Sequence, residues 1–272
     1  MMMIFTTPLL ALLLATSGAL ANPAPAAPFN PTKALTGTPL EMALTNGQRM
    51  ARGLPPNKPH FRRHLRARAG PSAVAAAANP APTGTCTPRT GVVHVSATDP
   101  ARPVLDGYLG RTANEFGEYT YTAERANALS VTLDDCSGAP FDLLTTNGFK
   151  TFPYLGAIKG FSSDDAELRP GAFNYLYIGG VSQTAPRATP QTVGNSFSGT
   201  TGEAEPSESA IWSFASGGGD VLQPQWINPD GSLPRNTLVY VPSRNVFALV
   251  GDVPAFEQMF ENASPVTLVF QA

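Results

Sequence analysis

Three carboxylate clusters could support acid–base chemistry in this sequence. They consist of Asp134 and Asp135, of Asp164, Asp165 and Glu167, and of Glu203, Glu205 and Glu208. Glycoside hydrolases place two carboxylates on either side of the scissile bond, about 5 Å or about 6.5–9.5 Å apart. A solvated surface can have the same composition. The clusters therefore leave two interpretations open, a glycoside hydrolase or lyase and a charged surface.

Other catalytic arrangements are not expected. Only His64 and His94 follow the basic pair at residues 62–63, and the stretch GNSFSG has Ser198 where a G-x-S-x-G nucleophile turn needs glycine. Two cysteines and so few histidines are too few ligands for a zinc site, and the loop SSDDAE lacks the alternating acidic spacing of a calcium loop. Phosphate-binding glycine motifs are absent from the sequence. We expect no metal and no cofactor, and favour a non-catalytic protein.

The aromatic residues suggest a binding site. Sugars present apolar C–H faces and a rim of hydroxyls, so sugar sites pair an aromatic ring with Asn, Gln or Asp side chains. Gln225, Trp226, Asn228 and Asp230 have this composition, and Trp212 lies shortly before them. The alternative is that Trp226 belongs to the core and that the residues after it form a β-turn.

Short strands separated by turns must position these residues. Apolar, aromatic and β-branched residues recur at period two, as at Val93 and Val95. The segments with strand character are 91–98, 118–123, 128–135, 141–152, 154–161, 174–181, 209–215, 237–243, 245–252 and 265–272. This pattern predicts a single all-β domain over 84–272, a sandwich or a jelly roll.

Two local signals refine that prediction. Asn147-Gly148 predicts a type I′ hairpin turn, which requires positive φ at both residues. Near the C-terminus, Asp252 is a suitable N-cap and Pro254 suits a first helical turn, so we expect one short helix there. A further short helical turn is expected in 123–129.

The N-terminus has the features of a secretory signal peptide. An apolar run is followed by Ala19-Leu20-Ala21, which predicts cleavage after Ala21, and the run is too short to span a bilayer. We therefore expect an extracellular protein with no membrane segment after cleavage. In an oxidising compartment, Cys86 and Cys136 predict one structural disulfide.

Residues 22–83 are rich in Pro and Ala and carry eight Lys or Arg against one acid, Glu41, a net charge of +7. Large apolar residues are scarce, so this leader is predicted to be disordered, as a pro-segment or linker. Arg62-Arg63 is a dibasic pair that a processing protease could cut, which would remove 22–63. The alternative is a retained basic tail that binds an anionic wall polymer or polyanions in general.

The remainder, 84–272, has ten Lys or Arg against 19 Asp or Glu, a net charge of −9. An acidic domain disfavours nucleic acid and anionic membranes as partners. Asn262-Ala263-Ser264 is a weak glycosylation sequon, because Pro265 follows it.

Residues 45–56, TNGQRMARGLPP, resemble a leader segment, TN-x-QR-x-ARGLPP, of secreted β-domain proteins from mushroom-forming fungi. ESAIW at 208–212, PQWINPDGS at 224–232 and Gly251-Asp252 are also similar to that family. The resemblance implies secretion, a fungal origin and a shared β domain. It transfers no catalytic residues.

Three functions follow as hypotheses. The first is a secreted, non-catalytic domain that binds cell-wall polysaccharide or glycan. The second is a secreted glycoside hydrolase or lyase with paired carboxylates. The third is an effector or structural protein that binds another protein. Fold alone does not choose among them.

Overall fold

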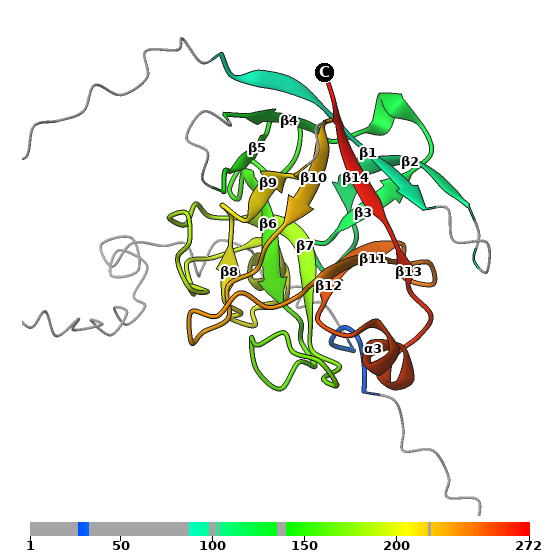
Figure 1. Cartoon of the computed structure of the whole chain (residues 1–272), viewed down its shortest axis with the longest axis vertical. Helices are drawn as coiled ribbons and strands as arrows, with labels where there is room; N and C mark the ends of the chain where they lie inside the picture. The colour runs from blue at the N-terminus through cyan, green and yellow to red at the C-terminus, as the bar shows by residue number, and fades with distance from the viewer. Residues whose placement is uncertain (1–26, 33–86, 98–101, 103, 135–139, 217–218) are drawn as a thin grey trace, which may run out of the picture.

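Four strands form the centre of a large antiparallel sheet, and we call them the central sheet (Figure 1). The computed structural model describes residues 27–32, 87–97, 102, 104–134, 140–216 and 219–272. The central strands are hydrogen-bonded in the order β11 (Thr237–Val241), β12 (Val246–Val250), β7 (Tyr175–Val181) and β6 (Tyr154–Lys159). Every residue of β7 and β12 is buried, as expected for strands covered on both faces.

The other strands extend this sheet and close it on itself. They are β1 (Arg89–Ala97), β2 (Leu105–Ala113), β3 (Tyr119–Thr122), β4 (Ser130–Leu133), β5 (Leu143–Thr145), β8 (Ser207–Glu208), β9 (Trp212–Phe214), β10 (Val221–Pro224), β13 (Ser264–Pro265) and β14 (Thr267–Gln271). The order is β13-β11-β12-β7-β6-β5-β4-β1-β14-β10-β9, and β8 pairs with β6. Strand β2 pairs with β1 and β3, and β3 pairs with β12, which completes a circuit from β12 back to β1. The all-β, sandwich-like prediction is confirmed.

The first face of the central sheet packs against strands of the same domain. Leu176 and Ile178 of β7 and Phe247 and Leu249 of β12 contribute to this core. Their partners come from β1, β2, β4, β5 and the region of the two tryptophans, and include Val93, Val95, Leu109, Leu129, Val131, Leu143, Trp212 and Trp226. Strands from all parts of the domain, from β1 to β14, thus close this face.

The second face is formed by the alternate residues of the same strands, among them Tyr175, Tyr177 and Val250. Two helices cover it, α2 (Ser196–Thr201) through Phe197 and α3 (Val253–Met259) through Phe256. Residues 27–32 complete the cover, and in Figure 1 their blue trace lies beside α3. A segment far upstream in the sequence is therefore part of the core.

For residues 27–32 the prediction of a disordered leader is wrong. Phe29 is only 1% exposed, and its ring stacks on Tyr175 at a centroid distance of 4.6 Å. Tyr177, Phe256 and Phe260 meet the same ring edge-on. Burial of one Phe side chain contributes roughly 1.5–3 kcal/mol, and each aromatic pair adds about 0.5–1.5 kcal/mol. The burial of this one ring therefore offsets the entropy cost of ordering the short segment, although the segment's composition predicts disorder.

Both α-helices begin at side-chain caps. Asp252 accepts a hydrogen bond from the Ala255 amide at 3.0 Å, with Pro254 in the first turn, which confirms the predicted C-terminal helix. Asn195 caps α2 in the same way by accepting from the Ser198 amide at 2.8 Å. The predicted turn in 123–129 is the 3₁₀-helix η1 (Arg125–Asn127). Helix α2 was not predicted, because its six residues are too few to show a helical period.

The hairpin predicted within 141–152 does not form, because only its first part, β5, is a strand. Strand β5 pairs instead with β6, with Leu143 opposite Leu155. Neither Asn147 nor Gly148 has positive φ, so the predicted type I′ turn is wrong. Asn147 instead accepts from the Ser130 amide at 2.8 Å and so ties the connecting loop to β4. Strands β2 and β10 were also not predicted.

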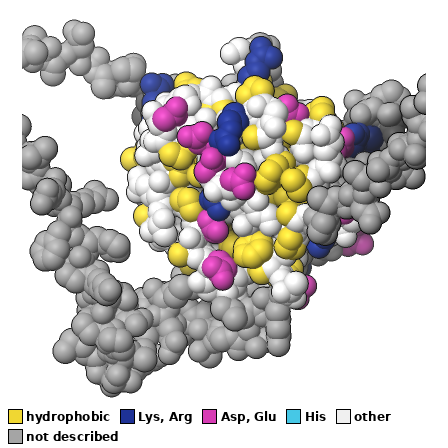
Figure 2. Space-filling view, turned by 90° about the horizontal axis from the view of Figure 1, so that it is seen from below, with side chains coloured by type: hydrophobic (Ala, Val, Ile, Leu, Met, Phe, Trp, Pro, Cys, Tyr) yellow, Lys and Arg dark blue, Asp and Glu magenta, His cyan; other side chains and the backbone are white. Residues whose placement is uncertain are grey.

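Several predictions lie outside the described residues. These are the signal peptide with Ala21, the dibasic pair Arg62 and Arg63, and the cysteines Cys86 and Cys136. Among the described residues, no helix is both long and apolar enough to cross a bilayer. The face seen in Figure 2 carries acidic and basic side chains next to one another rather than a patch of one sign.

Candidate functional site

The two tryptophans predicted as a sugar-binding platform are core residues. Trp212 and Trp226 are both 0% exposed. The indole N–H of Trp212 donates to the Leu155 carbonyl at 2.7 Å, and that of Trp226 donates to the Ala166 carbonyl at 2.8 Å. A ring without an exposed face cannot stack on a sugar. The platform is therefore a wrong prediction, and the alternative of a core tryptophan holds.

The polar residues around Trp226 bind the chain itself. Asn228 is 6% exposed, accepts from the Leu168 amide at 2.9 Å and donates to the Leu168 carbonyl at 3.1 Å. Gln225 donates to the Pro234 carbonyl at 3.0 Å. Exposed Asp230 accepts from the Ser232 amide at 2.8 Å, and hydrogen bonds from the Ser232 side chain and then from its amide lower the pKa of the Asp230 carboxyl. PQWINPDGS therefore fastens a neighbouring loop to the body of the domain.

Two of the acidic clusters supply ion pairs. Arg169 contacts Asp165 at 3.1 Å and Glu167 at 3.0 Å, and these exposed pairs match the charged-surface interpretation. Lys159 contacts Glu205 at 3.2 Å, but only 15% of each side chain is exposed, so this pair is mostly buried. Among the described residues, no group of three or more His, Cys, Asp or Glu side chains could hold a metal ion.

Two glutamates are buried in separate places. Glu208 is 2% exposed and accepts from the Ile227 amide at 3.3 Å, and burial raises its pKa to about 9. Glu118 is fully buried and accepts from Asn114 at 2.5 Å and Asn30 at 3.3 Å, and burial raises its pKa to about 7. The Glu208 side chain is held beside Trp226, whereas the Glu118 side chain is held beside the leader.

The Glu118 site is short of hydrogen-bond donors. Both Glu118 Oε1 and Asn30 Oδ1 are buried without a hydrogen-bond partner. A protonated Glu118 carboxyl supplies one hydrogen to this pair of acceptors, and burial favours that form. Glu118 was not predicted to be a site residue, because a lone glutamate next to a strand is usually solvated.

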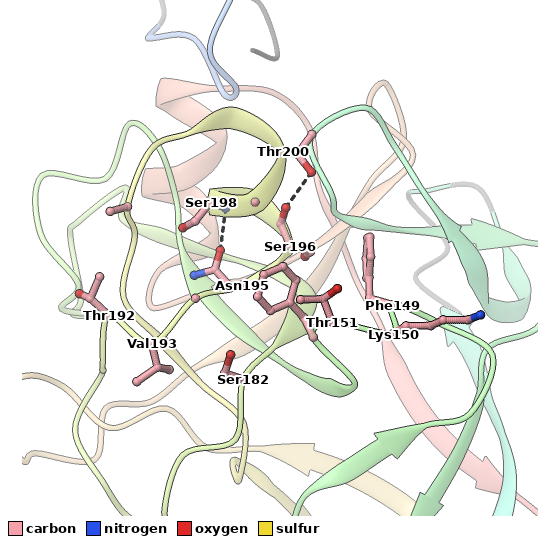
Figure 3. Close-up of a pocket in the computed structure, with 14 residues that line it drawn as sticks. Phe149, Lys150, Thr151, Ser182, Thr192, Val193, Asn195, Ser196, Ser198 and Thr200 are labelled. Atoms are coloured by element: carbon pink, nitrogen blue, oxygen red, sulfur yellow. Dashed lines mark hydrogen bonds between the residues drawn. The ribbon is translucent and has the colours of Figure 1, made fainter. Parts of the chain in front are cut away.

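An open pocket lies between the loop 149–152 and helix α2 (Figure 3). Its volume is about 620 Å³, within the range of small-molecule sites. Phe149 and Phe152 are half-buried in its wall. A Cβ atom at Gly199 would lie 2.9 Å from the Phe152 ring, so a glycine there lets the ring approach α2 closely.

Hydroxyls lie around these rings, whereas the Asn195 amide in the lining is 0% exposed and bonded to the chain. Ser182, Thr192 and Thr200 line the pocket together with Asn195, and Figure 3 shows Ser182 and Thr192 at the side away from Lys150. The cap bond of Asn195 fixes the start of α2 and so places the Thr200 hydroxyl, which donates to the Ser196 carbonyl at 2.8 Å. The arrangement joins apolar ring surface to a polar rim.

The serines of GNSFSG line this pocket but are engaged elsewhere. Ser196 Oγ donates to the Gly117 carbonyl at 2.5 Å and accepts from the Gly180 amide at 3.0 Å. Ser198 Oγ accepts from the Glu205 amide at 3.1 Å. The lining holds no histidine or carboxylate that could activate a hydroxyl. The pocket is therefore suited to binding rather than to nucleophilic catalysis.

The pocket was not predicted from the sequence, although a signal was present. GFKTFP places Phe149 and Phe152 in a loop between a glycine and a proline, where aromatic rings are not needed for a strand. Compared with protein-family models, with curated proteins and with solved structures, the chain finds no match. The functional argument accordingly depends on the pocket itself.

Proposed function

We propose that this protein is a secreted, non-catalytic β domain that binds a cell-wall polysaccharide or glycan in the pocket between loop 149–152 and α2. The observation that carries the proposal is the pair of half-buried rings, Phe149 and Phe152, beside a rim of hydroxyls. Sugars need that combination of apolar ring surface and hydrogen-bonding groups. This pocket takes the place of the sugar site that was predicted around Trp226, because the rings and amides there pack in the core or bind the chain itself.

Binding assays on insoluble polymers test this proposal. The full secreted chain is incubated with chitin, β-glucan and cellulose. The pelleted polymer is then assayed for bound protein, and the supernatant for released sugar. We expect retention without sugar release. Phe152→Ala should weaken retention roughly tenfold, which corresponds to about 1.4 kcal/mol of lost contact.

Tyr108→Ala is the matched control, because Tyr108 is a half-buried aromatic residue on β2 that does not line the pocket. It should leave retention unchanged. Sugar release would favour the carboxylate-based hydrolase instead. The absence of both retention and sugar release would contradict the glycan proposal and favour a protein partner.

We also propose that Cys86 and Cys136 form a disulfide, as secretion implies. The described part of β1 pairs Arg89 with Leu133 of β4 in antiparallel register. Cys86 precedes Arg89 by three residues, and Cys136 follows Leu133 by three. Each cysteine is thus three residues in sequence from one of these paired residues, and secretion supplies the oxidising compartment in which the two would form a disulfide.

Processing at the dibasic pair is part of the same proposal. Cleavage after Arg63 by a secretory-pathway protease would break the covalent link between 22–63 and the domain. Arg62→Ala together with Arg63→Ala should leave a longer secreted product, and mass spectrometry measures its N-terminus. An unchanged mature N-terminus would contradict processing at this site.

A further inference from the structure

A cleft on the second face holds the segment 27–32 through contacts of the kind that recognise a peptide. Phe29 fills it, and Tyr175, Tyr177, Phe256 and Phe260 surround its ring. We call these four residues the aromatic cleft. Ring contacts on several sides define one position for one side chain, as an anchor residue requires.

The backbone of the segment is also bound. The Phe29 carbonyl accepts from the Tyr175 hydroxyl at 2.5 Å and from the Tyr177 hydroxyl at 2.6 Å. The Pro28 carbonyl accepts from the Ser162 hydroxyl at 2.5 Å. These hydrogen bonds fix the direction of the segment, and the prolines at 28 and 31 limit the backbone freedom that docking removes.

The next side chain adds a polar contact at depth. Asn30 is 6% exposed and donates to the Glu118 carboxyl, which also accepts from Asn114. An apolar anchor followed by an amide that meets a buried carboxyl is a specific combination, because a mismatched side chain would leave Glu118 without that donor. The cleft thus recognises Phe followed by Asn.

We propose that the aromatic cleft, with Glu118, is a peptide-binding site whose ligand is the segment 27–32 of the same chain, so that the leader stays bound non-covalently when the chain between it and the domain is cut. Each contact of the leader named above joins a residue that precedes Arg62 to a domain residue that follows Thr87. A cut at the dibasic pair therefore leaves every one of them in place.

The site is separate from the proposed glycan pocket. Helix α2 lies between the two, with Phe197 stacked on Tyr177 at 4.9 Å on the cleft side and Asn195 and Thr200 on the pocket side. Figure 3 shows the blue segment beyond α2 from the pocket residues. A failure to bind glycan would therefore not contradict the peptide-binding proposal. Loss of the leader after cutting would likewise not contradict the glycan proposal.

The test uses the full chain with a recognition sequence for a site-specific protease inserted after Arg63. After complete cutting, sedimentation velocity at high protein concentration reports whether the leader fragment travels with the domain. We expect the two fragments to stay together. If the two fragments separated after cutting while the domain stayed folded, the proposal would be overturned.

Two variants sharpen the test. Phe29→Ala should lower the retained fraction of leader at least tenfold, whereas Phe61→Ala, a matched change in the same leader, should not alter it. Equal retention in both variants would overturn the proposal. Asn30→Asp keeps the side-chain size but places a second carboxyl beside Glu118, so we expect the leader to be released more readily as the pH rises through neutrality.

A peptide competition covers the case in which Phe29→Ala does not fold. A synthetic peptide of residues 27–32 is added in excess to the cut wild-type chain. We expect it to displace the leader at equilibrium, and the same peptide with Phe29→Ala not to do so. No displacement by the wild-type peptide, or equal displacement by both, would overturn the proposal.

Discussion

The two faces of the central sheet are closed in different ways. On the first face, strands from β1 to β14, with Trp212 and Trp226, build a core from residues of the domain alone. On the second face, two short helices leave a cleft that Phe29 fills from the leader. A face closed by the domain's own strands depends on the domain, whereas a face closed by a distant segment depends on keeping that segment bound.

The largest effect is expected on the first face. Trp226→Ala removes a fully buried ring and its hydrogen bond to the Ala166 carbonyl. We expect a loss of about 5 kcal/mol in the free energy of unfolding, at the upper end for large-to-small core changes. Chemical denaturation measures it. A loss under about 1 kcal/mol would show that the first face does not depend on this ring.

The proposed disulfide should also stabilise the first-face strands. It would join the start of β1 to the end of β4 and close a loop of about 50 residues, worth roughly 4 kcal/mol in the loop-entropy model. Reduction, or Cys86→Ser with Cys136→Ser, should lower stability by a comparable amount. Alkylation of both thiols in the non-reduced secreted protein would contradict the disulfide.

The buried glutamates let pH distinguish the faces. Each has a folded-state pKa raised above its unfolded value of 4.5, so the folded protein holds the proton longer and stability falls as pH rises. For Glu118 the fall runs from about pH 4.5 to about pH 7, and for Glu208 from about pH 4.5 to about pH 9. At about 1.4 kcal/mol per pKa unit, each loss is on the order of 3 kcal/mol or more.

Denaturation at several pH values checks both windows. Glu118→Gln should flatten the profile between about pH 4.5 and about pH 7 only, because burial of this carboxyl is the main cause of its raised pKa. Glu208→Gln should flatten it up to about pH 9. Stability that rises between pH 5 and pH 7 in the wild type, with no change in either variant, would contradict these assignments.

The smallest change in stability is expected at the pocket. Phe152 is half-buried, so Phe152→Ala should cost about 1 kcal/mol or less while it weakens glycan retention. Parallel denaturation and polymer-binding measurements separate the two effects. A stability loss as large as that of Trp226→Ala would place Phe152 in the core instead of a binding site.

The sequence predicted what depends on local pattern. Alternation identified β1 and β4, unbroken apolar runs identified β7 and β12, and the cap at Asp252 identified α3. Each of these signals is contained in a few consecutive residues. The confirmed elements are therefore those whose cause is local.

What the sequence did not predict depends on contacts between distant residues. Phe29 is a single ring among prolines and alanines, without period or neighbours of its own kind, and only the cleft gives it a role. Trp226 has the composition of a sugar site, yet its place in the core follows from the loop that its N–H contacts. The pocket likewise arises where loop 149–152 meets α2.

The most direct measurement is the unfolding free energy of Phe29→Ala beside that of Phe61→Ala in the full chain. If the leader closes the second face, Phe29→Ala should lose about 3 kcal/mol, as for a buried Phe, and Phe61→Ala should match the wild type. Equal stability of the two variants and the wild type would show that the second face is closed without the leader.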